Sequence, residues 1–259
     1  MKIIMSSIEC FVPSMNGEDI STTVESFSRS ESFTGVTVLS GVSLRSTGTL
    51  RDIAEAVSHK YLLIYTKDKP LEMGMLALDR MLAIADDTGA DMLYADHYTL
   101  KDGADGVPCR QRHPLIDCQK GALRDDFDFG SVLVFKASSF KKAVRAMDAD
   151  YEWGALYDLR LRMKKIVHVN EYLYTEIETD ARKSGEKLFD YVDPKNRAVQ
   201  VEMEKICTEH LKRIGAWLPP VFKDADPAVL AKSSDETVSY PVTASVVIPV
   251  YNRIRTVKD

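Results

Sequence analysis

The sequence predicts an α/β protein whose central sheet is mostly parallel and flanked by helices. Short apolar runs alternate with segments of helical periodicity along residues 1–94, in the order β-α-β-α-β-α-β. The run YLLIY at residues 61–65 is apolar throughout, as a strand covered on both faces must be. Gly89 follows a long helical segment, where a C-terminal cap belongs. Together these observations favour parallel strands joined by helices.

Six short apolar runs are expected to form strands. The first leads into a turn at residues 13–17, and the second is short and mostly β-branched, with Gly41 marking a turn after it. The last continues into the segment EYLYTEIETD. The expected strands span residues 1–12, 36–39, 61–65, 92–94, 131–135 and 166–169.

Apolar residues that recur three or four positions apart predict the helices. Ile20, Val24 and Phe27 follow this spacing in the first helix. The last is a strongly amphipathic helical extension, which Pro219-Pro220 stops. The expected helices span residues 18–29, 49–58, 71–88, 138–146, 153–163 and 196–214. Residues 97–128 are polar and broken by glycine and proline, so no regular element is expected there.

The composition narrows the classes of function. A chain of 259 residues can bury one good core, or a domain with additions. The net charge of −5 and the lack of a basic block argue against a nucleic-acid partner. No apolar run approaches the ~20 residues that span a bilayer. Glu9 interrupts the apolar stretch at the N-terminus, which makes a poor signal peptide.

The cysteines favour a reducing compartment. Cys10, Cys109, Cys118 and Cys207 follow no zinc-binding spacing. Free thiols in the cytoplasm are the expectation, and a Cys109–Cys118 bridge is the alternative. We therefore expect a cytoplasmic protein, either free or at the inner face of the membrane, with no transmembrane segment.

Two segments near the ends of the chain share one pattern. Residues 245–252 read SVVIPVYN, and residues 11–16 read FVPSMN, so an apolar run precedes proline in both and asparagine follows three positions later. We interpret them as one motif that appears twice, the second time cut off. The expected organisation is an α/β domain at 1–180, a loop and helical extension at 181–222, a linker at 223–243 and the truncated start of a second domain at 244–259.

The motif at residues 245–252 resembles the entrance of the family 2 glycosyltransferases, whose first strand reads S-V-I-I-P-x-Y-N. Residues 61–96 look like the central stretch of this family, and Asp158-Leu159-Arg160-Leu161-Arg162 looks like its Asp-Leu-x-Leu-Arg helix. The resemblance covers most of residues 1–180 and implies the A-type glycosyltransferase fold. It also implies transfer of a sugar from a nucleotide-sugar donor to a glycan or lipid acceptor, in the synthesis of surface polysaccharide or glycoconjugates.

The resemblance further implies a metal site. Two carboxylates one residue apart hold Mg²⁺ or Mn²⁺, which neutralises the departing diphosphate. The family's Asp-x-Asp turn aligns with Thr66-Lys67-Asp68, so Asp68 is the candidate metal ligand, and Lys67 could contact the diphosphate directly. The candidate residues for binding the nucleotide-sugar and cation are Pro13, Asn16, Ser40, Lys67, Asp68 and Asp96.

The chain departs from the family at the acidic positions. Thr66 replaces the first carboxylate of the metal turn, and Ser40-Gly41 stands where the family has the Asp-Asp that contacts uracil. Ala155-Leu156 replaces the catalytic Glu-Asp. An inverting transferase needs a carboxylate that takes the proton of the acceptor hydroxyl. Glu152 is the best substitute, and Asp158 is the second catalytic candidate.

Two of these residues also have simpler interpretations. Asp68 could cap the helix expected to begin near Leu71, because aspartate at such a turn accepts backbone N–H bonds. Asp96 could face a ligand cleft at its strand end or lie in a solvated turn.

Two functions follow from this pattern. In the first, the chain is an active glycosyltransferase module. In the second, it is a catalytically degenerate module that binds an acceptor or partner beside an active downstream domain, since fold and function are separable.

Overall fold

The computed structural model describes residues 6–14, 20–102, 107–119, 121–177 and 196–220. The chain divides into two compact units, Met1–Trp217 and Leu218–Asp259, and the fold described below is that of the first. Asn16, the expected linker at 223–243 and the second motif copy at 244–259 lie outside the described residues.

The described residues form one mixed sheet. Its strands are β1 (Ile8–Ser14), β2 (Phe33–Ser40), β3 (Tyr61–Tyr65), β4 (Leu71–Met73), β5 (Met92–Asp102), β6 (Pro108–His113), β7 (Val132–Lys136) and β8 (Ile166–Ile177). Their order is β2-β1-β3-β7-β5-β8-β4, and β6 pairs with β5. Strands β4, β6 and β7 run against the common direction of the other strands. The expected α/β fold with a mostly parallel sheet is confirmed.

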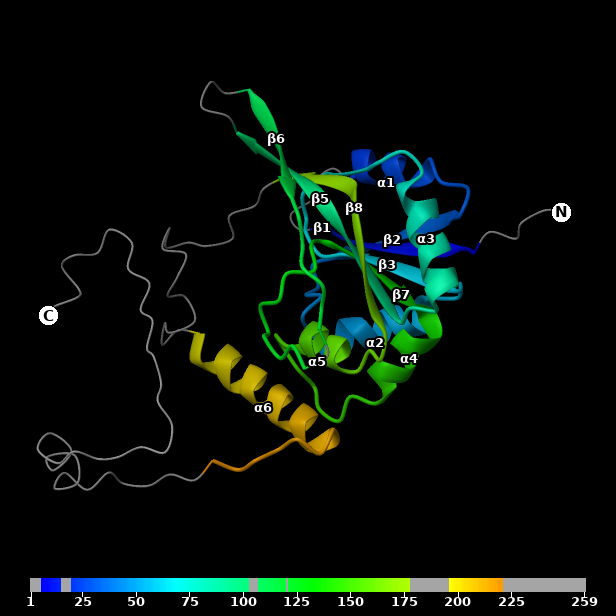
Figure 1. Ribbon diagram of the computed structural model, residues 1–259. Coiled ribbons are helices and arrows are strands. Elements are labelled where there is room, and N and C mark those ends of the chain that lie inside the picture. The colour runs from blue at the N-terminus through cyan, green and yellow to red at the C-terminus, as the bar shows by residue number, and fades with distance from the viewer. Residues whose placement is uncertain (1–5, 15–19, 103–106, 120, 178–195, 221–259) are drawn as a thin grey trace, which may run out of the picture. The chain divides into compact units, whose positions relative to one another are not determined.

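Helices cover both faces of this sheet. They are α1 (Ser21–Ser28), α2 (Thr47–Ala56), α3 (Ala77–Thr88), α4 (Ala137–Arg145), α5 (Ala155–Leu161) and α6 (Arg197–Arg213). Helices α1 and α3 lie on one face, and α2, α4 and α5 lie on the other (Figure 1). Because side chains alternate along a strand, β3 places Leu62 and Ile64 in one apolar core and Leu63 and Tyr65 in the other. This explains why its sequence is apolar throughout.

The expectation of a helix from residue 71 is wrong at its start. Leu71–Met73 form β4, which pairs antiparallel with β8, and α3 begins only at Ala77. Asp68 therefore has no helix at Leu71 to cap.

The reason lies in α1, far away in the sequence. The backbone N–H of Leu71 donates to Thr23 Oγ1 at 3.0 Å, and that of Met73 donates to Ser26 Oγ at 3.2 Å. Leu76, just before α3, adopts a left-handed backbone with φ of 56°. Tertiary partners thus override the local helical periodicity.

The expectation of irregular structure at residues 97–128 is wrong for residues 97–102 and 108–113. Strand β5 continues to Asp102, and β6 pairs with it from His97↔His113 to Asp102↔Pro108. Almost all of β6 is exposed, so its sequence shows no apolar alternation. The guanidinium of Arg110 instead lies 3.8 Å from the ring centroid of Tyr98 on β5, which supports the hairpin from outside the core.

Helix α6 packs on α5, with the buried Ile206 and the acidic Glu202 among its contacts. Ile206 is fully buried in the core that α5 shares. The Glu202 carboxylate accepts the backbone N–H groups of Glu152 (3.0 Å), Trp153 (2.8 Å) and Gly154 (2.6 Å). The N-cap residue of α5 is Gly154, which has no side chain to accept these N–H groups, so Glu202 caps the helix from α6.

Removal of this cap is expected to destabilise the protein. Glu202→Ala should lower the free energy of unfolding by about 2 kcal/mol, because three backbone donors lose a charged acceptor. Urea denaturation would measure the loss. Glu204→Ala is the matched control, since Glu204 is exposed on the same helix, and it should change stability by less than about 0.5 kcal/mol. Equal effects of the two changes would contradict the capping role.

Two expectations concerned a disulfide bridge and membrane-spanning helices. All four cysteines are free, so the alternative Cys109–Cys118 bridge is absent. Among the helices that the structure describes, none is both long enough and apolar enough to cross a membrane.

Candidate functional site

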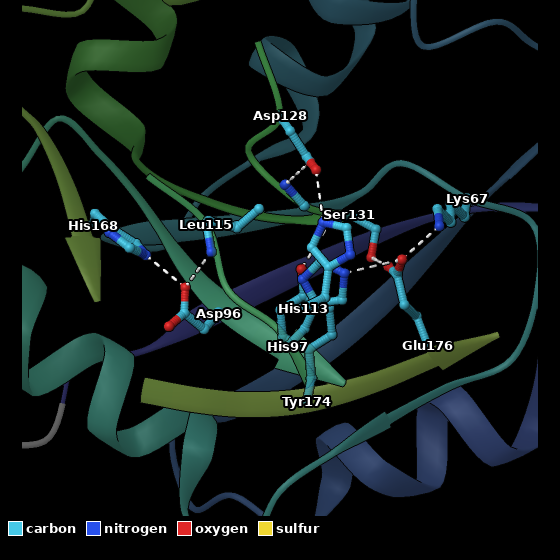
Figure 2. A network of polar contacts seen from close by, with 11 residues as sticks. Lys67, Asp96, His97, His113, Leu115, Asp128, Ser131, His168, Tyr174 and Glu176 are labelled. Atoms are coloured by element: carbon cyan, nitrogen blue, oxygen red, sulfur yellow. Dashed lines mark hydrogen bonds and ion pairs between the residues drawn. The ribbon is translucent and has the colours of Figure 1, made fainter. Parts of the chain in front are cut away.

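The carboxyl ends of the parallel strands carry a buried group of charged side chains. Lys67 lies two residues after the end of β3, and Glu176 lies near the end of β8. Lys67 Nζ and Glu176 Oε1 are 2.5 Å apart (Figure 2). The lysine side chain is 28% exposed and the glutamate side chain 5%, so only the lysine offers charge to solvent. In α/β proteins, ligands bind at this edge of the sheet.

Two further side chains hold the Glu176 carboxylate. His97 Nε2, on β5, lies 3.2 Å from Glu176 Oε1, and Ser131 Oγ donates to Glu176 Oε2. Burial by itself would raise the pKa of Glu176, but His97, Lys67 and Ser131 outweigh it and lower this pKa to about 2. Glu176 is therefore a fixed anion. We call Lys67, Glu176, His97 and Ser131 the strand-end cluster.

Aromatic rings hold His97 in position. Its ring stacks on Tyr174 with centroids 4.9 Å apart and on His113 with centroids 4.4 Å apart. Tyr174 Oη accepts the backbone N–H of Ser131 at 3.0 Å. His97 Nδ1 is buried and has no hydrogen-bond partner in the described part of the chain. The His97 imidazole is thus fixed by stacking and by its single contact with Glu176.

Asp96 anchors a loop. Its side chain is 1% exposed, and Oδ1 accepts the backbone N–H of Leu115 at 2.7 Å. His168 on β8 bridges Asp96 at 2.9 Å and Asp117 at 2.8 Å (Figure 2 shows the Asp96 side of this bridge). Tyr94 Oη donates to the carbonyl of Ile116 at 2.6 Å. The segment after β6 is thereby tied to β5 and β8.

The remaining residues expected at the donor site lie along the same edge. Pro13 is buried opposite Leu39, and Ser40 is exposed beside Ser14. Asp68 is half-buried, one residue after Lys67. Pro13 and Ser40 thus lie at the ends of β1 and β2, and Lys67 and Asp68 lie just after β3. Asp96 instead lies within β5, which continues to Asp102, so the expectation that it ends a strand or lies in a solvated turn is wrong. The binding roles of these residues stay predictions.

The two candidate catalytic residues lie around α5. Asp158 is 1% exposed, and its carboxylate lies 2.8 Å from Arg162 Nε and 4.0 Å from an Arg213 nitrogen. Glu152 is exposed, just before the helix. Ala155, at the aligned position of the family's base, is buried and donates its backbone N–H to the carbonyl of Arg45 at 2.9 Å. Both catalytic assignments stay predictions.

The residues at the aligned metal turn do not fit a divalent cation. Thr66-Lys67-Asp68 offers one carboxylate, and the ammonium of Lys67 already holds the nearest buried one, Glu176. Within the described residues, no group of three or more His, Cys, Asp or Glu side chains is placed to hold a metal. Hard divalent cations prefer several oxygen ligands, and this turn offers one carboxylate. The positive charge that the turn carries is the ammonium of Lys67.

Glu176, His97 and Ser131 are not among the site residues predicted from the sequence. Glu176 gave a signal, because it follows Tyr174 at the two-residue period of a strand, which places a carboxylate on an inward face. An inward carboxylate requires a cationic partner. His97 gave only its position next to Asp96 after an apolar run, and Ser131 gave no signal. The contacts of both with Glu176 depend on the order of strands β7, β5 and β8 in the sheet.

Comparisons with known proteins give weak structural similarity. No protein-family model and no curated protein matches the chain. A fragment of S. aureus TarS, residues 1–349 in complex with UDP-GlcNAc, is 12% identical with a TM-score of 0.47, over 82% of this chain and 73% of that one. The mannosyltransferase PcManGT from Pyrobaculum calidifontis, in complex with GDP-Man and Mn²⁺, is 8% identical with a TM-score of 0.45, over 90% and 70%. These structural neighbours are proteins that bind nucleotide-sugars, and the similarity carries no functional assignment.

Proposed function

We propose that this chain is a glycosyltransferase-like module that binds a nucleotide-sugar at the carboxyl edge of its sheet, with Lys67 in place of a divalent cation. The observation that carries the proposal is the Lys67–Glu176 ion pair. It places a fixed, partly exposed ammonium in the turn that aligns with the family's Asp-x-Asp. The compact positive charge of a lysine ammonium in this turn would compensate the negative charge of a bound phosphate.

The cluster can bind a diphosphate without losing its own contacts. A lysine ammonium has three donors, and one points to Glu176, so two remain for phosphate oxygens. His97 and Ser131 hold Glu176, which keeps the lysine from turning away. Asp68 and Ser40 lie along the same edge and are proposed to contact the nucleotide or sugar, together with Pro13, Asn16 and Asp96.

The geometry around α5 favours binding over turnover. The Asp158 carboxylate is paired with Arg162 and lies 4.0 Å from Arg213, and an apolar residue, Ala155, stands where the family has its base. Glu152 is the remaining candidate base for transfer to a glycan or lipid acceptor. We therefore favour a binding module that works beside an active downstream domain, in cytoplasmic assembly of surface glycans. Transfer by this chain itself is the second candidate function.

The proposal is tested by calorimetric titration with UDP and GDP, in EDTA and in Mn²⁺. We expect binding in EDTA, and Lys67→Ala should weaken it at least tenfold because the phosphate-facing charge is gone. Lys60→Ala is the matched control. Lys60 precedes the same strand and also lies 2.5 Å from a carboxylate, that of Asp86, but at the opposite edge of the sheet.

Two outcomes separate the alternatives. Binding that requires Mn²⁺, or that Lys67→Ala leaves intact, would refute the role of the lysine. Release of UDP from UDP-GlcNAc, or of GDP from GDP-Man, in the presence of acceptor and abolished by Glu152→Gln would establish transfer, and the binding module would then be the wrong choice of the two.

A further inference from the structure

A hollow opens at the edge of the sheet opposite to the strand-end cluster. Its volume is about 1310 Å³. Asp91, which precedes β5, and Lys165, which precedes β8, both line it, so it lies at the amino ends of two parallel strands. Helix α4 contributes Ser139 and Lys142, and α6 contributes Arg213. The strand-end cluster is at the other end of these strands.

The lining of this hollow is strongly basic in an acidic protein. The chain as a whole carries a net charge of −5. Asp91 is the carboxylate among the described lining residues, and it accepts Ser139 Oγ at 2.5 Å and the backbone N–H groups of Lys164 and Lys165 at 3.1 and 3.0 Å. The lining cations are Lys142, Arg160, Arg162, Lys164, Lys165 and Arg213. We call these residues the basic hollow.

The fold neutralises only part of this charge. Arg162 and Arg213 share the buried carboxylate of Asp158. Lys142 and Lys164 are exposed, and neither forms an ion pair within the described residues. Like charges held this close repel one another in the absence of a counter-ion.

Arg160 is the strongest indication of a ligand. It is only 6% exposed, and its Nη2 donates to the carbonyl of Arg124 at 2.6 Å. Its Nε and Nη1 are buried and without a hydrogen-bond partner in the described part of the chain. The guanidinium carbon lies 4.9 Å from the ring centroid of Tyr157 and 5.3 Å from that of Phe129. Asp125 and Asp126 interact with Arg160 only at longer range, because no ion pair of Arg160 is formed within the described residues. A buried guanidinium without a paired carboxylate costs stability, and an anion in the hollow would offset that cost.

We infer that the basic hollow binds a ligand that bears a phosphate or pyrophosphate ester. A phosphoryl group supplies the negative charge that Arg160, Lys142 and Lys164 lack, and arginine and lysine are the side chains that recognise it. The volume exceeds that of one phosphate and is of the size that encloses a whole small molecule. This inference does not rest on the donor site, because the two sites share no residue.

The test uses inorganic pyrophosphate with the full chain carrying Lys67→Ala, so that the strand-end cluster does not contribute. Calorimetric titration should show binding that Lys142→Glu with Lys164→Glu weakens about tenfold or more and that added salt also weakens. The control is Arg197→Glu with Lys205→Glu, the same change of charge at exposed positions on α6 outside the hollow, which should leave binding unaltered.

Vesicles distinguish the source of the phosphate. Phosphatidic acid vesicles could bind where pyrophosphate does not. If Lys142→Glu with Lys164→Glu abolishes that binding, the phosphate ester is carried by a lipid and the inference stands. The inference is overturned if pyrophosphate and vesicles both bind the Lys142→Glu, Lys164→Glu variant as tightly as the Arg197→Glu, Lys205→Glu control. It is also overturned if neither ligand binds the protein whether or not Lys142 and Lys164 are replaced.

Arg160→Met gives a second, independent readout. In the absence of anion, this variant should unfold at the same temperature as the parent or higher, because an uncompensated charge is replaced by an apolar side chain of similar length. Pyrophosphate should raise the unfolding temperature of the parent and not that of the variant. A variant that unfolds earlier but keeps its stabilisation by pyrophosphate would show that Arg160 is structural and would overturn its assignment to the ligand.

Discussion

Gly130→Ala is expected to lower the free energy of unfolding by about 3 kcal/mol, because two penalties act together. Gly130 has a φ of +67°, a conformation that alanine adopts only with strain. An added Cβ would lie 2.2 Å from Tyr174 Oη and 3.3 Å from His97 Nδ1. Tyr174 cannot move away without losing its hydrogen bond from Ser131 N and its stacking on His97. Urea denaturation would measure the loss.

Gly89→Ala separates the two penalties. Gly89 has nearly the same φ, +65°, but an added Cβ there meets nothing within 4 Å. Alanine at this C-cap should cost about 1 kcal/mol, from backbone strain alone. The difference between the two variants then measures the crowding at Tyr174. Equal losses would show that the ring of Tyr174 yields freely, and that the strand-end cluster is less rigid than its contacts indicate.

The predictable part of the fold is the part whose signal is local. Strand β3 is apolar at every position because both of its faces are covered, so its sequence is sufficient to predict it. Strand β6 is the opposite case. It is almost entirely exposed and exists through pairing with β5, so its sequence shows no period. Strand β4 carries a helical pattern, and Thr23 and Ser26 from α1 hold it extended.

The same distinction applies to the site. Lys67 could be predicted as a strand-end residue, because it follows an apolar run. The same reasoning misplaces Asp96, because β5 continues to Asp102 through its pairing with β6. The contacts that Lys67 and Asp96 make could not be predicted from the sequence. Lys67 meets Glu176, 109 positions away, and Asp96 meets His168, 72 positions away. These pairs depend on the insertion of β7 between β3 and β5 and on the register shift between β5 and β8 after Ala95 of β5, which no local pattern reveals.

Glu176→Gln is expected to lower the free energy of unfolding at pH 7 by about 3 kcal/mol. The pKa of Glu176 is about 2 in the folded protein, against 4.5 for the free side chain, and each pKa unit corresponds to about 1.4 kcal/mol. Glutamine has the shape of glutamate but lacks the negative charge that Lys67, His97 and Ser131 contact. Urea denaturation of both proteins across a pH series would measure the loss.

The pH series also fixes the sign of the effect. Because the folded pKa lies below the unfolded one, the ionised Glu176 stabilises the fold fully above pH 4.5, and this contribution disappears as the pH falls towards 2. The stabilities of parent and Glu176→Gln should therefore converge over that range. Glu171→Gln is the control on the same strand: its partner, Arg80, is 2.6 Å away, but the pair is solvent-exposed, so the change should be small. A constant gap between parent and Glu176→Gln from pH 7 to pH 2 would mean that packing, rather than the charge of Glu176, holds the cluster together, and would remove the physical basis for a fixed ammonium at Lys67.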